Sequence, residues 1–449
     1  MITSINVNGF RSLSDFSLDL RPGLNILVGP NGSGKTNIIT FFEFLSHLIL
    51  YGPSEAVNQL GGAGSVFTKL SGDEFEKHIK VKLYGCAEIS SHKYIKYCYS
   101  FTIAASENFD SIGFKEQELV LQKSSVFSQS NYMHEKSFCI KQNVVERKKQ
   151  VISTQNYKKQ MVDSSFLPPP MRNKITNDKT IIEDFLRHND KDAPLVNSLA
   201  FLVEVVRFVA ADLRGGQIFN IVPSRVKQPE ESSSPVGIKK DGSGLAATLY
   251  AIINKKKHQG DIFFPGRFVI RRYTRDVDLK HTSIGDIVKY LKTANAAINK
   301  IDVVNDRFDN LLKIRFWIEK KDVSTMLPLS AMSDGTVKWL TLVTAILTSP
   351  SIFSLEEPEN FLHPLMQSEV VKLMRHATEG RKKKTSIFMS THSETILNNA
   401  TPSEVVVISF EGGRSRADRC SNQNELREEI KRTGFGLGFY YISGSLTNE

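Results

Sequence analysis

Residues 29–36 read GPNGSGKT and fit the pattern GxxxxGK[ST], whose residue types suit phosphate binding. Backbone N–H groups in such a glycine-rich turn close around phosphate oxygens, and the helix that follows adds its positive N-terminus. We predict that Lys35 supplies a cation to the outer phosphates of ATP and that Thr36 supplies a hydroxyl to Mg²⁺. The predicted phosphate cradle consists of Gly29, Pro30, Asn31, Gly32, Ser33 and Gly34.

The stretch SIFSLEEPENFLHP at 351–364 ends an apolar run with two adjacent carboxylates, Glu356 and Glu357. Like charges repel, and burying either one is costly, so a positive group should lie beside them. In proteins with this phosphate loop, a neighbouring strand ends in a carboxylate that holds Mg²⁺. We predict that Glu356 holds Mg²⁺, directly or through water, and that Glu357 is the general base. Mg²⁺ and Lys35 would then supply the positive charge.

Two further segments suit the same chemistry. SDGT at 333–336 begins a predicted helix, and a helix N-terminus of this kind binds anions. Because phosphates already lie at Lys35, this second site would serve the γ-phosphate of an ATP held by another copy, although four residues alone also describe an ordinary N-cap. In STHSETIL, His392 ends a predicted strand and is placed to sense the γ-phosphate. The residues predicted for the second site are Ser333, Asp334, Gly335 and Thr336.

The surrounding pattern predicts an α/β protein. Short strands precede residue 29, a helix follows residue 36, and three β-rich pieces at 78–85, 93–103 and 111–123 indicate an antiparallel meander. Residues 124–175 are polar, and 178–300 show mostly helical spacing. The strand–helix–strand order after residue 350 predicts parallel strands. We therefore expect an N-terminal lobe (1–125), an insertion (126–324, polar and then helical) and a C-terminal lobe (325–449).

Composition limits the class of protein. The 449 residues are 40% hydrophobic and carry a net charge of +10, which suits nucleic acid or an acidic protein as partner. The cysteines Cys86, Cys98, Cys139 and Cys420 are scattered, which argues against a zinc ribbon or a disulfide framework. No membrane span or signal peptide is apparent, so a cytoplasmic protein is expected.

Taken together, these motifs resemble those of ABC-type ATPase heads of the RecF, Rad50, SMC and OLD group, and of the AAA15/AAA21 ATPases of bacterial defence systems. NGFRSLSDFSLDL with GLNILVGPNGSGKTNII resembles their N-terminus, and SAMSDGT resembles their signature motif. FSLEEPENFLHP resembles Walker B with the D-loop, and STHSETIL resembles the switch-histidine segment. The resemblance implies an ABC-ATPase head whose mixed sheet includes the antiparallel meander, with a mostly helical insertion.

The resemblance also implies site residues and assembly. Two copies would form a nucleotide-sandwich homodimer, in which Lys35 of one copy and Ser333 of the other grip one ATP. Arg11 matches a basic position near the nucleotide, and Gln59 is a loose match to a Q-loop. DGSGLAATL at 241–249 resembles a DGxNLA segment of the defence branch, with Gly244 in place of the usual Asn.

Size and layout are most similar to the PtuA family, the ATPase subunits of Septu antiphage systems, which act with an HNH nuclease (PtuB). The resulting expectation is a regulatory ATPase that controls a separate nuclease, and the resemblance also implies dimers that build a larger oligomer. Only about 55 residues follow His392, too few for an ordinary nuclease domain. A PARIS-like ATPase holding a Toprim effector and a RecF-like DNA repair ATPase are the alternatives, and an ATP-binding assembly protein with little hydrolysis is a third.

Four basic clusters are candidate DNA contacts, although each alone also fits a solvated face. We favour the pair in the insertion, Lys255 to Lys257 with Arg271, Arg272 and Arg275. The other two clusters lie at 147–149 and 381–384.

Overall fold

The phosphate-loop segment lies in the first of two units that make up the chain. In the computed structural model this unit comprises Met1–Gly216, Lys382–Ser386 and Val406–Cys420, and the second comprises Gln217–Arg381, Ile387–Val405 and Ser421–Glu449. Each unit has its own sheets and helices. The described residues are 1–90, 93–124, 127, 138–146, 148–153, 177–189, 196–254, 282–320, 323–349, 352–379, 385–420 and 422–446.

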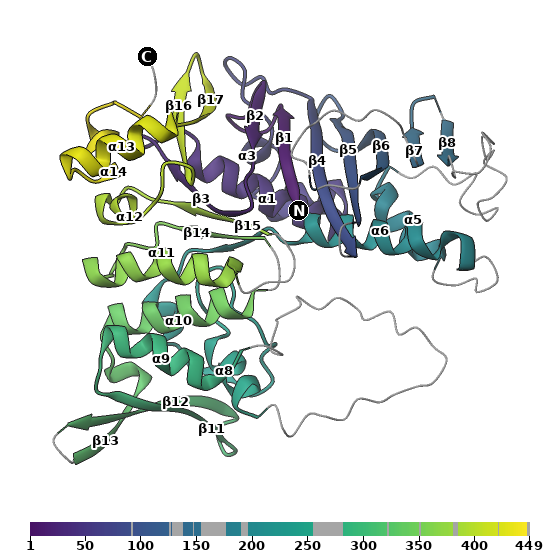
Figure 1. Cartoon of the computed structure of the whole chain (residues 1–449). Helices are drawn as coiled ribbons and strands as arrows, with labels where there is room; N and C mark the ends of the chain where they lie inside the picture. Colours follow the sequence, from purple (N-terminus) through teal and green to yellow (C-terminus); the bar gives the residue numbers. More distant parts are fainter. Residues whose placement is uncertain are drawn as a thin grey trace. The chain divides into compact units, whose positions relative to one another are not determined.

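An antiparallel sheet dominates the first unit, with the strand order β2-β1-β4-β5-β6-β7-β8 (Figure 1). Along β4, Ile79, Val81 and Leu83 are buried, whereas the alternate side chains of Lys80 and Lys82 are exposed. This period of two fixes which face of the strand meets the core. The strands are β1 (Ile2–Asn8), β2 (Phe16–Asp19), β4 (His78–Ser90), β5 (Lys93–Ala105), β6 (Ile112–Ser124), β7 (Phe138–Asn143) and β8 (Lys148–Ser153).

A second group of strands in this unit has the order β17-β16-β3. The buried strand β3 leads through the phosphate loop into the long apolar helix α1. The Ser46 hydroxyl of α1 donates to the Arg214 carbonyl at the end of α6 (2.7 Å), so these two helices are tied together. The elements are β3 (Gly23–Val28), β16 (Val405–Glu411), β17 (Arg414–Arg419), α1 (Lys35–Tyr51), α2 (Pro53–Gln59), α3 (Ala63–Val66), α5 (Ile181–Asn189) and α6 (Val196–Arg214).

The second unit contains parallel strands with β14 between β15 and β9. The predicted strand–helix–strand segment is confirmed, since α11 connects β14 to the parallel strand β15. The elements are β9 (Gln217–Phe219), α7 (Pro223–Val226), η4 (Leu329–Ala331), α10 (Asp334–Thr348), β14 (Phe353–Glu356), α11 (Pro364–Glu379), β15 (Ser386–Ser390), α12 (Glu394–Asn398), α13 (Gln423–Thr433) and α14 (Leu437–Ile442).

A small antiparallel sheet forms the other part of this unit, and α8 and α9 lie against it (Figure 1). Helix α10 packs on α9, where the buried Trp339 donates its indole N–H to the Tyr290 carbonyl (2.8 Å). The elements are β10 (Glu230–Glu231), α8 (Leu245–Ile253), α9 (Ile284–Ala294), β11 (Ile298–Asp306), β12 (Leu311–Lys320) and β13 (Val323–Pro328).

The predicted mixed α/β fold with an antiparallel meander is confirmed, and the insertion contains more strand than its sequence indicates. Within the polar stretch, β7 and β8 extend the meander. The helix expected to run to about residue 300 ends at Ala294, because the following Ile and Val residues pair with β12. Local helical spacing was outweighed there by cross-strand burial.

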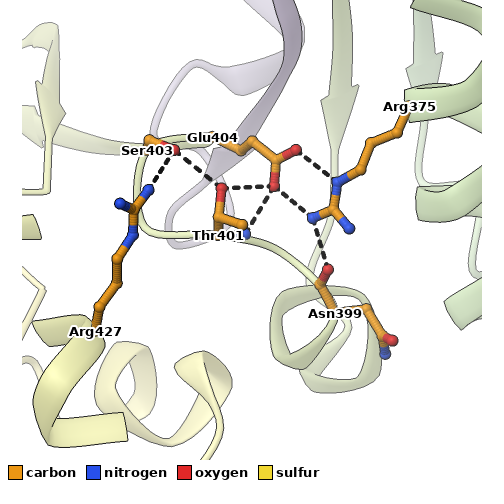
Figure 2. Close-up of polar contacts among 6 residues, drawn as sticks. All are labelled: Arg375, Asn399, Thr401, Ser403, Glu404 and Arg427. Atoms are coloured by element: carbon orange, nitrogen blue, oxygen red, sulfur yellow. Dashed lines mark hydrogen bonds and ion pairs between the residues drawn. The ribbon is translucent and has the colours of Figure 1, made fainter. Parts of the chain in front are cut away.

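A polar network at the end of the second unit holds the loop before β16 (Figure 2). Arg375 on α11 donates to both carboxylate oxygens of Glu404 (2.8 and 2.6 Å) and to the Asn399 carbonyl. Glu404 also accepts from the backbone and hydroxyl of Thr401. Arg427 on α13 donates to the Ser403 hydroxyl at 3.3 Å.

Among the described helices, none is both long and apolar enough to span a membrane.

Candidate functional site

The phosphate loop has the strand–loop–helix context that its sequence predicts. Strand β3 ends at Val28, and α1 begins at Lys35. The Lys35 side chain is buried, and its ammonium donates to the carbonyls of Gly29 (2.8 Å) and Pro30 (2.9 Å). Thr36 is exposed at the first turn of α1. The lysine therefore lies across its own loop, with its charge held where outer phosphates bind in loops of this type.

Two glycines of the loop have no room for a side chain. A Cβ on Gly29 would lie 2.1 Å from the Ile408 carbonyl oxygen, and one on Gly34 would lie 2.0 Å from the Ser415 hydroxyl. Gly34 also has φ 104°, a conformation that L side chains rarely adopt. The Ser33 hydroxyl is buried without a hydrogen-bond partner. This tight cradle with an unsatisfied hydroxyl fits a phosphate-binding loop.

Behind the loop, a chain of hydrogen bonds reaches Arg11. Ser415 donates to the Ser33 carbonyl (2.8 Å) and lies 2.7 Å from the Ser12 hydroxyl. Asn37 donates to Ser12 (2.7 Å) and accepts from the Arg11 guanidinium (3.4 Å). Burial lowers the pKa of Arg11, partly offset by Glu43. Arg11 is thus connected to the phosphate loop through Asn37, Ser12 and Ser415, and its expected position near the nucleotide stays a prediction.

The second group of predicted residues lies at the carboxyl ends of parallel strands in the second unit. Glu356 is the last residue of β14 and pairs in register with Ser390 of β15. Its carboxylate accepts a hydrogen bond from the side-chain amide of Asn220 (3.3 Å), the residue that follows β9. Ligands of open α/β sheets bind at such strand ends. Asn220 was not predicted from the sequence, because the preceding strand β9 has only three residues, too few to show the alternation of a strand.

The next residues form a tight acidic turn, defined here as 356–361. Glu357 has φ 42°, and its backbone N–H donates to the Ser390 carbonyl (3.1 Å). Its carboxylate accepts from Asn360 (3.1 Å) and lies 4.0 Å from His392 Nε2. Glu356, Glu357 and His392 are therefore brought together, as predicted.

Glu359 connects the acidic turn to the histidine segment. One carboxylate oxygen accepts from the Thr391 hydroxyl and from the His392 backbone N–H, each at 2.8 Å. The other oxygen is buried without a hydrogen-bond partner. Glu359 thus fixes the backbone of His392. The sequence analysis did not predict this role, because it assigned roles only to the adjacent Glu356 and Glu357.

A buried lysine also faces this turn. Lys338 on α10 is 1% exposed, and its ammonium donates to the Glu357 carbonyl (3.3 Å). Burial lowers the pKa of Lys338 to about 8, although Glu359 and Glu357 act to raise it. Sequence analysis assigned the positive charge here to Lys35 and Mg²⁺ and missed Lys338. The available signal was a single lysine in a helix whose other residues after the first turn are all apolar or threonine.

The signature residues begin α10 as an N-capped helix. The Ser333 hydroxyl accepts from the Thr336 backbone N–H (3.3 Å) and lies 2.9 Å from the Thr336 hydroxyl. Asp334, in the first turn with Gly335, forms a salt bridge with Lys227 at 2.7 Å. Lys227 neutralises a carboxylate that would otherwise weaken anion binding at this helix end.

The DGSGLAATL segment forms the entrance to α8. Asp241 accepts from the backbone and hydroxyl of Ser243 (3.0 and 2.8 Å), and Glu230 accepts from the backbone N–H groups of Gly244 and Ala247. The Asn220 backbone N–H donates to the Lys240 carbonyl (2.8 Å). The residue just before this segment, Lys240, therefore holds the backbone of Asn220, whose side chain donates to Glu356.

Other predicted positions lie elsewhere. Gln59 lies on α2 and donates to Glu55 of the same helix (2.9 Å). The basic clusters at 255–257, 271–275 and 381–384 and Arg147 lie outside the described residues. Within the described part of the chain, no group of three His, Cys, Asp or Glu side chains is arranged to hold a metal by itself. Mg²⁺ commonly takes one or two carboxylates plus substrate phosphates, so the Glu356 carboxylate in the second unit is of a donor type that Mg²⁺ prefers, and so is the exposed Thr36 hydroxyl in the first unit.

Two protein-family models match the chain, and both describe AAA domains. The AAA_23 model, described as "AAA domain", matches residues 4–322, which is more than half of the chain. The AAA_21 model matches residues 254–398, and its description combines "AAA domain" with "AbiEii toxin" and "Type IV TA system".

Short segments of the chain are similar to curated RecF proteins. The DNA replication and repair protein RecF of Corynebacterium jeikeium is 40% identical over 47 residues, covering 10% of this chain and 11% of RecF. That of Erwinia tasmaniensis is 44% identical over 46 residues, covering 10% and 13%. The chain thus spans about a tenth of the length of the curated relatives it matches.

Solved structures with similarity along the chain are SMC heads. The SmcHead bound to the C-winged helix domain of ScpA has a TM-score of 0.49 at 13% identity, covering 94% of this chain and 99% of that one. The SMC head domain from Thermotoga maritima has a TM-score of 0.38 at 11% identity, with coverages of 94% and 99%. The family match itself is decided by the long AAA_23 alignment: the chain belongs to the AAA-domain family and is an ATPase of this type.

Proposed function

We propose that this chain binds ATP and Mg²⁺ and hydrolyses ATP through the residues described above. Gly29, Pro30, Asn31, Gly32, Ser33 and Gly34 hold the phosphates, and Lys35 neutralises them. Thr36 and Glu356 hold Mg²⁺, which when bound stabilises the negative charge of the phosphates. Support comes from the buried Lys35 and from the two glycines that have no room for a Cβ.

In the same proposal, Glu357 accepts a proton from the attacking water. A general base must be held within hydrogen-bond reach of that water, and the contacts of Glu357 with Ser390, Asn360 and Lys338 restrict its position. His392, whose backbone is fixed by Glu359, senses the γ-phosphate.

We further propose that two copies share each nucleotide. The α10 N-terminus, with Ser333, Asp334, Gly335 and Thr336, contacts the γ-phosphate of an ATP held by the other copy. The salt bridge between Lys227 and Asp334 supports an anion-binding role, since it neutralises the carboxylate nearest this helix end. The bond from the Thr336 N–H to the Ser333 hydroxyl is that of an ordinary N-cap, so an anion would have to take this donor from Ser333. Arg11, connected to the phosphate loop through Asn37 and Ser12, contacts the nucleotide.

The biological role proposed is regulatory. We infer an ATPase subunit of an antiphage defence complex that controls a separate nuclease, in the manner of Septu, with a small HNH protein as partner. The AAA_21 match over residues 254–398 favours a defence setting, because its description names a toxin of a toxin–antitoxin system. A PARIS-like complex with a Toprim effector is the neighbouring alternative.

A RecF-like DNA repair ATPase is the second candidate function. The observation that favours it is the similarity of short segments to RecF, at 40% identity over 47 residues. The net charge of +10 is compatible with DNA as partner in either reading.

The experiment that separates these functions is affinity purification of the tagged chain from its native host at low salt, with intact masses of all retained proteins. A stoichiometric HNH protein is the expected result, whereas a Toprim protein points to the PARIS-like complex. A chain that purifies alone, with ATP hydrolysis stimulated by added DNA, overturns the regulatory role in favour of repair.

A further inference from the structure

The buried lysine of α10 lies against the backbone of the acidic turn. Lys338 is 1% exposed, and lysine is almost never fully buried unless it is paired. Its ammonium donates to the Glu357 carbonyl (3.3 Å) and lies 5.7 Å from the centre of the Phe361 ring. One cation thus contacts both ends of the turn.

The acidic turn has an unusual backbone that needs such support. Glu357 (φ 42°) and Phe361 (φ 66°) are both left-handed, although neither is glycine. Such conformations are unfavourable for residues other than glycine and persist only where the surroundings impose them. Besides Lys338, the Ser390 carbonyl holds the Glu357 N–H, and the Asn360 N–H donates to the Glu357 carbonyl (3.3 Å). The direction of the Glu357 side chain therefore depends on these contacts.

We propose that Lys338 is a positioning residue for hydrolysis: it fixes the backbone of Glu357 and thereby aims the general-base carboxylate. This inference rests on the proposed ATPase function and deepens it by adding a residue outside the recognised motifs. Lys338 contacts neither water nor phosphate in this role, and acts through the Glu357 carbonyl.

Lys338 lies close to the signature residues along α10. It follows Asp334 by four residues, so it lies on the same helix face one turn along from the signature residues.

Position 338 suits a lysine, because its N–H groups can donate to the Glu357 carbonyl and its charge lies near two carboxylates. The ammonium faces the carboxylates of Glu357 and Glu359. The Oε2 atom of Glu359 is buried without a hydrogen-bond partner. Methionine has a similar length without donor or charge, so Lys338→Met removes the hydrogen bond while filling most of the space. Because Lys338→Met also leaves the partly buried Glu359 carboxylate without the cation that faces it, some loss of stability is expected, and the melting temperature is measured alongside kcat.

The test is a double-mutant cycle on the full chain, measuring kcat and KM for ATP hydrolysis with Lys338→Met, Glu357→Gln and the combined variant. Lys338→Met should lower kcat by about 10- to 100-fold with KM unchanged, because small displacements of catalytic groups cost factors of this size. In the Glu357→Gln background the same change should have little further effect, and Lys338→Arg should restore part of the activity.

The outcomes separate this role from the function itself. Unchanged hydrolysis in Glu357→Gln overturns the proposed mechanism and this role with it. A loss in Glu357→Gln without one in Lys338→Met, or losses that multiply in the combined variant, overturns the positioning role alone. Lys372→Met is the matched control, since this lysine of α11 is 61% exposed, and it should leave kcat unchanged.

A second variant keeps the test decisive if Lys338→Met folds poorly. Phe361 is 62% exposed, so Phe361→Ala removes the ring beside the ammonium without opening the core. It should lower kcat in the same direction, by less than Lys338→Met, with the melting temperature retained. An unchanged kcat in Phe361→Ala, together with a Lys338→Arg variant that is no more active than Lys338→Met, contradicts the proposal.

Discussion

The phosphate loop and the acidic turn differ in which parts of the chain hold their functional groups in place. The loop is one continuous run, 29–36, whose backbone groups and Lys35 are placed by local geometry and by the closely packed Ile408 and Ser415. The acidic turn takes its contacts from separate segments, with Asn220 after β9, Lys338 on α10 and Ser390 at the end of β15. Both segments can be recognised from their residues, but the groups that hold the phosphate loop lie largely within it, whereas the groups that hold the acidic turn come from distant segments and cannot be read from spacing.

The difference also predicts how each region fails. Backbone cradles depend on glycine and on space, so added atoms should damage the phosphate loop. The acidic turn depends on hydrogen bonds from other elements, so lost donors should damage it. Five predictions follow this contrast, in order of decreasing effect.

Glu357→Gln should have the largest effect, because it removes the proposed base while keeping the shape of the acidic turn. We expect kcat to fall by about 10²–10⁴-fold, the usual contribution of general acid–base catalysis, with ATP binding retained. Steady-state phosphate release and equilibrium binding of a fluorescent ATP analogue measure the two quantities. Glu428→Gln on the exposed face of α13 is the control, and equal rates in both variants would contradict the assignment.

Lys35→Ala should follow, since it removes the cation from the phosphate loop. We expect hydrolysis to fall by about 10²–10³-fold, as on removal of one transition-state donor, and ATP binding to weaken with it. This joint loss distinguishes the loop from the acidic turn, where binding survives. Lys431→Ala, at a side chain that is 72% exposed, should change neither quantity.

Gly34→Ala tests the spatial limit of the cradle. Its φ of 104° and the Ser415 hydroxyl 2.0 Å from a Cβ should together destabilise the fold by about 1–3 kcal/mol and weaken ATP binding. Urea unfolding followed by tryptophan fluorescence gives the free energy. Gly72→Ala controls for left-handed backbone alone, because its Cβ meets nothing within 4 Å. Equal costs at both glycines would show that the cradle is not tight.

Asn220→Ala tests the donor that faces Glu356. Outer-shell partners of metal ligands are typically worth 10–100-fold in metal affinity, so the Mg²⁺ concentration for half-maximal hydrolysis should rise by about 10-fold. Titration of hydrolysis with Mg²⁺ at saturating ATP measures it. Asn360→Ala, which loses a bond to Glu357 instead, should change kcat rather than the Mg²⁺ requirement. The same shift in both variants would argue against Glu356 as metal ligand.

Glu404→Gln should have the smallest effect, since this carboxylate lies outside both regions. Burial alone would raise the pKa of Glu404, but hydrogen bonds from Arg375 and Thr401 outweigh it and the pKa is lowered from 4.5. Its stabilisation is therefore present above pH 4.5 and is lost as pH falls through the lower folded value.

We expect Glu404→Gln to reduce the free energy of unfolding by about 1–2 kcal/mol at pH 7, as for a hydrogen bond to a charged group. The difference from the parent chain should shrink below pH 4.5, which unfolding curves at several pH values will show. A difference that is constant with pH would mean that the ionised carboxylate is not what Arg375 holds.

Much of the fold followed from pattern. The alternation in β4 to β6, the strand–loop–helix at residue 29 and the parallel pair β14 and β15 were all predicted and are confirmed. The strands β7, β8 and β11 were not predicted. Residues 298–301 of β11 continue the apolar spacing of the preceding helix, and they form a strand because they pair with β12. Cross-strand pairing is a long-range property that local spacing does not contain.

The sequence by itself determined the identity of the phosphate loop and of the acidic strand end, since both chemistries require particular residues at short, fixed spacing. Only the tertiary structure decided what surrounds them: Lys338 at the Glu357 carbonyl, Glu359 at the His392 backbone, and Ser415 beneath Gly34. The physical reason is that these partners are separated along the chain and act through burial and hydrogen-bond geometry. Both of these exist only once the elements have packed.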